Sequence, residues 1–392
     1  MKPLEGIRII DLGRFVSAPF CGMLLADLGA EVIKVEKPVS GEDSRGVGPF
    51  LNGESLYVPT FNRNKKGVTI QTRKEEGIQL LKELIQSADV LLENYRPGTL
   101  EKMGLGYETI KELNPRIIVA SISGFGQTGP DAMRPAFDPI AQAVGGLYAI
   151  TGTEESGPLG AGTVIVDLTT GLYTAYAILA AVIQREQTGK GQYIDIAMVD
   201  CMVSMLHIYV PDFAANGTVP RRHGNRDPLS APADCYQTVD GYIVMHAGED
   251  KAYEKLQRLI DDARLADPKF NSHQGRVENQ EELEEYIRDW FKVRTTDEAE
   301  RALLESGIMA ARVYDIPHIF ASEQIKQREM LVEMDVPNAG TCIFQGNPIH
   351  MSDLRISYQR APMVGEHNQE VFGTLLKKEA ATLQILKEEG II

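Results

Sequence analysis

Residues 7–12 read Ile7-Arg-Ile-Ile-Asp-Leu12, residues 31–36 read Glu31-Val-Ile-Lys-Val-Glu36, and a helical segment from Ala18 to Leu28 lies between them. Short apolar runs rich in isoleucine and valine are typical of buried strands. Gly29 follows the helical segment, as a glycine at a helix C-terminus often does. A strand, a helix and a strand in this order predict a β-α-β unit and therefore an α/β fold.

The same alternation continues along the first half of the chain. Apolar residues at helical spacing predict a helix from Lys74 to Ala88, and apolar runs predict strands over 89–93 and 116–122. Alternating strands and helices indicate a Rossmann-like, mostly parallel sheet with helices on its faces. We expect this sheet to form a large domain of residues 1–195 and 335–392.

The sequence changes character after about residue 222. Asp240-Gly241 between two strand-like runs predicts a hairpin, and charged helices are predicted over 279–293 and 296–306. A last helix is predicted from His367 to Leu376. We expect a smaller α+β domain over 225–325, with 196–224 as a connector and 326–334 as a return linker.

Charge is unevenly distributed over the 392 residues. The net charge is −15, yet residues 1–105 hold 14 basic and 14 acidic side chains, and the remainder hold 26 and 41. The acidic balance argues against a nucleic-acid partner, and the neutral N-terminal quarter would repel an anionic ligand least. The longest apolar stretch is short for a membrane span, and no signal-peptide core is evident, so we expect a cytoplasmic protein without a membrane partner.

Several motifs of other enzyme classes do not occur in this sequence. The four cysteines are scattered and no histidines stand at ligand spacing, so no metal site is indicated. Neither a glycine-rich dinucleotide loop after the first strand nor a P-loop occurs. An ordinary nicotinamide or ATP enzyme is therefore disfavoured.

Asp167 stands between two apolar runs, Ala161-Gly-Thr-Val-Ile-Val and Leu168-Thr-Thr-Gly-Leu-Tyr. A carboxylate is costly to bury unless something pairs with it or uses it. Its place just before a helical stretch is typical of an N-cap, which Asp favours. The alternative is a carboxylate nucleophile, and the local pattern leaves both open.

Several ordered motifs together resemble the class III coenzyme A transferases, the family of formyl-CoA transferase and of the CaiB–BaiF type. The motifs include Asp11-Leu-Gly-Arg14, Asn62-Arg-Asn-Lys-Lys66, Glu93-Asn-Tyr-Arg-Pro-Gly98, Ser123 to Pro130, Asp167-Leu-Thr-Thr-Gly171 and Gly189 to Ile196. In this family an aspartate is the nucleophile, and Asp167 stands at the matching position. The resemblance implies transfer of CoA from an acyl-CoA to a free carboxylic acid through an aspartyl anhydride and an aspartyl-CoA thioester.

The resemblance also implies which residues contact CoA, which would be a substrate rather than a tightly bound cofactor. Lysines at these positions would bind phosphate, and backbone N–H groups near Ser17 are candidates for stabilising an oxyanion. The contacts fall on Val16, Ser17, Lys37, Arg73, Asn94, Tyr95, Arg96 and Lys102. The role of the Asn62–Lys66 signature stays open.

Two neighbouring residues bear on the chemistry. Asp138 matches a second acidic residue near the active site of these transferases, where it would position the acceptor acid or tune Asp167 through like charge; an N-cap before Pro139 is the alternative. Phe137 stands where related α-methylacyl-CoA racemases carry a catalytic histidine, and phenylalanine cannot transfer a proton. Racemisation with Asp167 as acid and base, and non-catalytic acyl-CoA binding, are the alternative functions.

The resemblance carries two further expectations. The family forms interlocked dimers in which each chain threads through a hole in the other, so it implies a homodimer. The stretch from Arg226 to Pro232 lacks the glycine run of the formyl-CoA transferase lid, which favours an acyl group larger than formyl.

Overall fold

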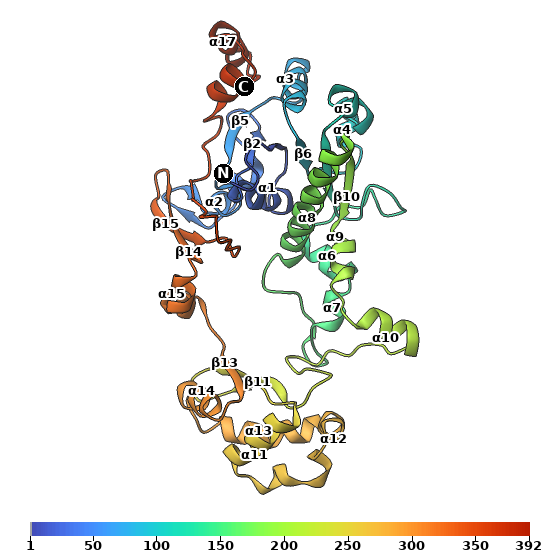
Figure 1. Cartoon of the computed structure of the whole chain (residues 1–392), viewed down its shortest axis with the longest axis vertical. Helices are drawn as coiled ribbons and strands as arrows, with labels where there is room; N and C mark the ends of the chain where they lie inside the picture. The colour runs from blue at the N-terminus through green and yellow to red at the C-terminus, as the bar shows by residue number, and fades with distance from the viewer. Residues whose placement is uncertain (1) are drawn as a thin grey trace. The chain divides into compact units, whose positions relative to one another are not determined.

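The computed structural model describes residues 2–392 (Figure 1). They form two compact units, each with a hydrophobic core of its own. The large unit comprises the chain up to Leu147, Gly160–Pro211 and Glu323–Ile392, and the small unit comprises Tyr148–Leu159 and Asp212–Ser322.

A six-stranded sheet forms the centre of the large unit, in the order β10-β7-β6-β1-β2-β5. Its strands are β1 (Arg8–Asp11), β2 (Glu31–Glu36), β5 (Lys66–Thr69), β6 (Val90–Glu93), β7 (Ile118–Ser123) and β10 (Tyr193–Ala197). Every neighbouring pair is parallel. The predicted α/β class is confirmed, because a helix between successive strands supplies the crossover that parallel pairing needs.

Helices cover both faces of this sheet. Ile9 and Ile10 of β1 are both fully buried but belong to different apolar clusters, since successive side chains of a strand point to opposite faces. The Ile9 face is covered by α1 (Ser17–Asp27), α6 (Asp138–Val144), α8 (Ile165–Thr188) and α9 (Met198–Ser204). The Ile10 face is covered by α3 (Glu75–Gln86), α4 (Thr99–Lys102), α5 (Tyr107–Leu113), the π-helix Gln369–Leu375 and α17 (Ala380–Glu388).

α8 is long and apolar enough to cross a membrane by length and composition, and so are α9 and α10 (Tyr209–Asn216) together as a bent pair. Helices in the cores of folded domains also meet this criterion. α8 packs on α1 through Gly171, where a Cβ would lie 2.8 Å from the Ser17 carbonyl oxygen. This close approach brings the start of α8 against the start of α1.

The large unit also contains short elements away from the sheet. They are β3 (Phe50–Leu51), β4 (Glu54–Ser55), α2 (Tyr57–Asn62), α16 (Glu323–Gln327), β14 (Leu331–Val336) and β15 (Gly340–Gln345). The short helix α7 (Leu147–Ile150) lies in the small unit except for its first residue. The helix predicted from His367 is the π-helix, and the sequence analysis did not identify α17, which packs its Leu383 against the sheet's core.

The small unit combines antiparallel strands with helices. Its sheet has the order β11-β12-β13, and the hairpin predicted at Asp240-Gly241 joins β11 to β12 through the pair Gln237 and Tyr242. The strands are β8 (Gly152–Thr153), β9 (Gly157–Pro158), β11 (Ala233–Gln237), β12 (Tyr242–His246) and β13 (Met309–Arg312). The helices are α11 (Asp250–Ile260), α12 (His273–Glu278), α13 (Gln280–Phe291), α14 (Thr296–Glu305) and α15 (Ile316–Ala321).

The compact units divide the chain at residues other than the predicted domain limits. Residues 148–159 lie in the small unit, where the Gly224 N–H donates to the Gly152 carbonyl at 2.7 Å and Arg222 Nε donates to the Thr153 carbonyl at 3.2 Å. The predicted connector 196–224 is divided after Pro211. The ranges expected for independently folding domains stay a prediction.

Candidate active site

The predicted CoA-contacting residues follow strands of the parallel sheet. Val16 and Ser17 follow β1, Lys37 follows β2, Arg73 follows β5, and the Asn94–Lys102 stretch follows β6. The carboxyl ends of parallel strands lie at one edge of a sheet. The strand order reverses between β1 and β6, and ligands of open α/β sheets bind at such a switch point.

Asn94 spans this switch point. Its side chain accepts from the Arg14 N–H at 2.8 Å and donates to the Arg14 carbonyl at 2.8 Å and to Ser17 Oγ at 3.1 Å. These bonds fix the turn from Gly13 to Ser17, which joins β1 to α1. Lys37 lies beside the turn, because Lys37 and Arg14 both pair with Asp43.

The other predicted CoA contacts are less closely joined. The Tyr95 N–H donates to Glu93 at 2.6 Å, and Arg96 lines a small cavity together with Glu93. Burial raises the pKa of Glu93 to about 7. Arg73 and Lys102 are exposed, and among residues 2–392 no hydrogen bond or ion pair of either side chain reaches the Gly13–Ser17 turn.

Asp167 is the third residue of α8, not its N-cap. The helix begins at Ile165 with Val164 at the N-cap position. Its first free N–H groups donate to a different carboxylate: those of Val166 and Asp167 lie 2.7 and 3.1 Å from Asp138 Oδ1. The N-cap interpretation of Asp167 is therefore wrong, because Asp138 satisfies these donors and leaves the Asp167 carboxylate unused by the helix.

Asp138 is buried, and both of its carboxylate oxygens accept hydrogen bonds. It is the first residue of α6 and makes no capping bond within that helix, so the N-cap interpretation before Pro139 is also wrong. Its Oδ2 accepts from Gln142 Nε2, and Gln142 Oε1 accepts from the Ala161 N–H at 2.9 Å. The Asp138–Gln142 pair thus holds both the loop before α8 and the first turn of α8.

The environment of Asp167 favours its neutral form. Its pKa is raised to about 7, first by burial and then by the negative charge of Asp138, while a hydrogen bond from the Ser17 hydroxyl lowers it. Asp167 as a whole is only partly buried. Perturbed carboxyl groups of this kind cluster at functional sites.

Tyr57 is an aromatic neighbour that the sequence analysis did not identify. Its pKa is raised to about 12 by burial and then by the charges of Asp167 and Glu42, so its hydroxyl is a neutral donor at pH 7. Its ring packs on Phe61 at 5.3 Å, Phe61 packs on Phe20 at 6.4 Å, and Phe20 lies against Gly171, one turn after Asp167. Tyr57 could be found as a neighbour of Asp167 only from the folded structure, through this packing of α2 on α1.

The Asn62–Lys66 signature is a hub of buried polar contacts. Arg63 makes two hydrogen bonds to Asp27, at 3.1 and 2.7 Å. Lys65 Nζ donates to Asp11 at 2.8 Å, to the Pro19 carbonyl at 2.7 Å and to Asn62 at 2.9 Å. Three acceptors saturate this ammonium group, which therefore ties β1 to the first turn of α1.

Phe137 is exposed at 66% and packs edge-to-face on Phe15, with ring centroids 6.0 Å apart. A phenyl ring beside Asp138 adds apolar surface to the site and no proton-transfer group.

The sequence matches CoA-transferase family III over residues 4–368. The whole chain is 36% identical to succinyl-CoA:glutarate CoA-transferase of Homo sapiens, 90% of which is covered. It is also 36% identical over its whole length to succinyl-CoA–D-citramalate CoA-transferase of Chloroflexus aurantiacus, 98% of which is covered. A crystal structure of a CAIB/BAIF family protein from Brucella suis superimposes with a TM-score of 0.86 and 36% identity, covering 95% of this chain and 99% of that one. The chain therefore belongs to CoA-transferase family III and is a CoA-transferase.

Proposed function

We propose that Asp167 is the nucleophile of the transfer. Its carboxylate attacks the thioester carbonyl of an acyl-CoA, which forms an acyl-aspartyl anhydride and releases the CoA thiolate. The thiolate attacks the aspartyl carbonyl, which forms an aspartyl-CoA thioester and releases the donor acid. The acceptor carboxylate then repeats these steps in reverse, so that CoA leaves on the new acid and Asp167 is regenerated.

One observation carries this proposal: the Asp167 carboxylate is placed at a helix start but is not used to cap it. Asp138 takes the N–H donors of the first turn, and the Asp167 carboxylate accepts from the Ser17 hydroxyl. A carboxylate with few donors and a raised pKa is a stronger nucleophile once ionised, as Brønsted behaviour requires. Asp138 would accordingly act by positioning and tuning Asp167.

We propose that the acyl groups are dicarboxylic, with succinyl-CoA as donor. The support is the activity of the two relatives, each of which pairs succinyl-CoA with a dicarboxylic acid. The missing glycine run between Arg226 and Pro232 agrees with an acyl group larger than formyl. The acceptor would be a dicarboxylic acid of about the size of glutarate or citramalate.

CoA would bind along the carboxyl edge of the sheet. In this proposal Val16, Ser17 and Asn94 hold the pantetheine arm near Asp167, and Lys37 and Lys102 bind phosphate. Arg73, Tyr95 and Arg96 would complete the site.

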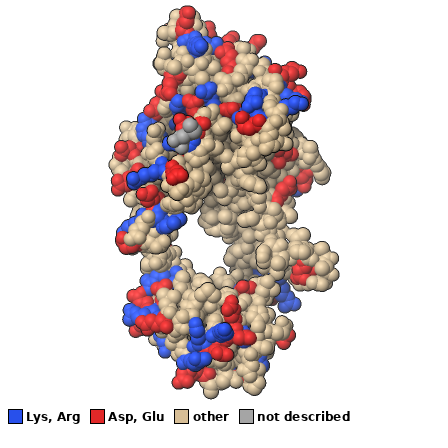
Figure 2. Space-filling model, viewed as in Figure 1, with Lys and Arg blue, Asp and Glu red and all other residues tan. Residues whose placement is uncertain are grey.

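We also propose that the enzyme is a homodimer, interlocked as the family resemblance implies. The large unit carries many exposed apolar side chains on three helices, and in the view of Figure 2 the surface over α8 and α9 has few charges. These side chains are Phe137, Ile140 and Val144 of the α6 region, Leu172, Tyr173 and Tyr176 of α8, and Val203 and Met205 of the α9 region. Apolar surface of this extent marks an interaction site.

The cytoplasmic location expected from the sequence stays a prediction.

The experiment is single-turnover trapping. The enzyme is mixed with succinyl-CoA, quenched with hydroxylamine or acid, digested, and searched by mass spectrometry for a modified Asp167 peptide. The proposal expects an adduct in the native enzyme and none in Asp167→Asn, with exchange between succinyl-CoA and glutarate lost in the same variant. Exchange without a modified Asp167 contradicts the proposal. Exchange of solvent deuterium at the α-carbon without an adduct would indicate a racemase, and binding without either reaction would indicate a non-catalytic protein.

A further inference from the structure

Side chains from other elements bond to the backbone of Gly13, Arg14 and Phe15 in the turn that leads from β1 to α1. Lys34 of β2 donates to the Gly13 carbonyl, and Asn94 binds the N–H and the carbonyl of Arg14. The Phe15 N–H donates to Glu42 Oε2 at 3.2 Å. Because Phe15 adopts a left-handed backbone with φ of 60°, which a bulky residue rarely does, its surroundings must impose that conformation.

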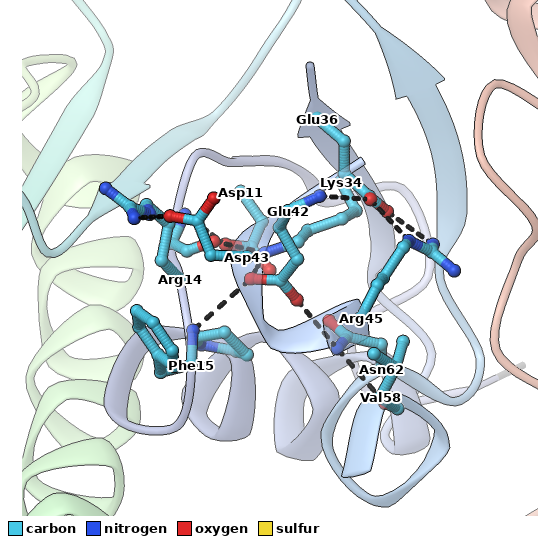
Figure 3. Close-up of polar contacts among 12 residues, drawn as sticks. Asp11, Arg14, Phe15, Lys34, Glu36, Glu42, Asp43, Arg45, Val58 and Asn62 are labelled. Carbon is cyan, nitrogen blue, oxygen red and sulfur yellow. Dashed lines mark hydrogen bonds and ion pairs between the residues drawn. The ribbon is translucent and has the colours of Figure 1, made fainter. Parts of the chain in front are cut away.

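Glu42 is the buried carboxylate at the centre of these contacts (Figure 3). Its side chain is 4% exposed and pairs with Lys34, which is fully buried, at 3.6 Å. Oε2 faces both Lys34 and the Phe15 N–H, and Oε1 accepts from Asn62 Nδ2 at 3.5 Å. Three donors therefore surround one carboxylate, and only a group with two acceptor oxygens satisfies all of them.

Phe15 is connected to the surroundings of Asp167 in two ways. Its ring packs on Phe137, the neighbour of Asp138, whose carboxylate holds the first turn of α8. Two residues after Phe15, the Ser17 hydroxyl bonds to Asp167. A change at Phe15 would therefore move both the turn and the capping carboxylate relative to Asp167.

We infer that Glu42 is a positioning residue of the transferase site: its carboxylate, which pairs with Lys34, accepts from the Phe15 N–H and so keeps the left-handed turn that presents residues 14–17 to Asp167. The inference rests on the proposed function of Asp167. Glu42 itself contacts no reacting atom in this scheme.

The test compares Glu42→Gln with Asp27→Asn. The amide of Glu42→Gln could present an acceptor oxygen to only one side, so either the Phe15 N–H or Asn62 would lose its partner. Asp27 is an equally buried carboxylate, paired with Arg63 at 2.7 Å, but it lies at the far end of α1. Both variants lose a buried ion pair, and only the first one should loosen the turn.

We expect Glu42→Gln to slow acyl-enzyme formation at saturating succinyl-CoA about 10- to 100-fold, the effect of a displacement of about 1 Å at a reacting group. Asp27→Asn should change this rate less than about threefold, with thermal unfolding of both variants measured in parallel.

A double-mutant cycle separates positioning from general stability. Phe15→Gly adopts positive φ without steric cost, so Glu42→Gln should cost less than about threefold in that background. The inference would be overturned by an unchanged rate in Glu42→Gln or by equal slowing in Asp27→Asn. It would also be overturned if the effects of Glu42→Gln and Phe15→Gly were fully additive. An absence of adduct in the native enzyme would instead overturn the proposed function.

Discussion

Asp138 and Asp167 lie in the first turns of two contacting helices, α6 and α8, and their surroundings differ sharply. Asp138 accepts from two backbone N–H groups through Oδ1 and from Gln142 through Oδ2, so both of its oxygens are hydrogen-bonded. The donor that reaches the Asp167 carboxylate is the Ser17 hydroxyl, and the Asp167 pKa is raised to about 7. Hydrogen-bond donors stabilise the charged form of a carboxylate. The scarcity of donors at Asp167 therefore leaves its carboxylate more basic than that of an ordinary aspartate.

The largest expected effect is the loss of Asp167. Asp167→Asn should lower the rate of CoA exchange about 10⁴-fold or more, because the proposed mechanism then loses its covalent nucleophile and keeps only binding and oxyanion stabilisation. The measurement is steady-state exchange between succinyl-CoA and glutarate. An Asn variant that retains a tenth of the activity would assign Asp167 a structural role like that of Asp138.

Removal of the capping carboxylate should have a smaller effect on rate and a clear effect on stability. Asp138→Ala should lower the unfolding free energy by about 1–2 kcal/mol, as the loss of an N-cap does, and slow acyl-enzyme formation about 10- to 100-fold through displacement of Asp167.

The matched control for Asp138→Ala is Thr295→Ala, which removes the N-cap of α14 in the small unit. It should lose similar stability and keep the native rate of acyl-enzyme formation. Equal rates in both variants would show that the Asp138 cap does not position the nucleophile.

The raised pKa of Asp167 also predicts that loss of its carboxylate stabilises the protein at high pH. Because the folded-state pKa of Asp167 is raised from 3.8 to about 7, the folded protein binds this proton more tightly than the unfolded chain does, and stability falls as pH rises through that window. At pH values above 7, Asp167 is ionised in the folded protein, and the loss of stability caused by its buried charge is complete. Asp167→Asn should therefore be more stable than the native enzyme by about 1–3 kcal/mol at pH 8.

The stability difference between Asp167→Asn and the native enzyme should shrink as pH falls toward 5. Denaturant unfolding at pH 8 and pH 5 measures it. A destabilised Asp167→Asn at pH 8 would contradict the raised pKa.

The pH dependence of catalysis follows from the same charge. In the proposed mechanism only ionised Asp167 attacks, so single-turnover acyl transfer should increase with pH through a midpoint near 7. Asp138→Asn removes the neighbouring charge that raises this pKa, so the midpoint should move down by about one pH unit. An unmoved midpoint would mean that Asp138 acts through geometry alone.

The sequence was sufficient for the framework of this site. The alternation of apolar runs such as Ile7–Leu12 and Glu31–Glu36 predicts a parallel sheet, because it depends on neighbours within a few residues and on the order of strands. Asp167 and Asn94 were expected in the site only through the family resemblance, since the local pattern at Asp167 favoured an N-cap.

The sequence could not identify the partners that give these residues their properties. Asp138 caps a helix that begins 27 residues later in the chain, and Glu42 holds the N–H of a residue 27 positions earlier. Propensity at Asp138 favours capping of its own helix, and the folded chain used it elsewhere. Partner choice among buried polar groups depends on tertiary packing, so Tyr57, Glu42 and the Asn62–Lys66 hub became interpretable only in three dimensions.

The smallest expected effect is a shift in the pKa of Asp167 when the Ser17 hydroxyl is removed. Ser17→Ala removes the hydroxyl that lowers the Asp167 pKa, so the midpoint of acyl-enzyme formation should rise by less than about one pH unit, opposite in direction to Asp138→Asn. Ser17→Thr keeps a hydroxyl and should hold the midpoint. Because Asn94 also binds Ser17 Oγ at 3.1 Å, Asn94→Ala should produce a shift of the same sign through a misplaced hydroxyl. A downward shift in Ser17→Ala would show that burial and Asp138 alone do not account for the basicity of Asp167.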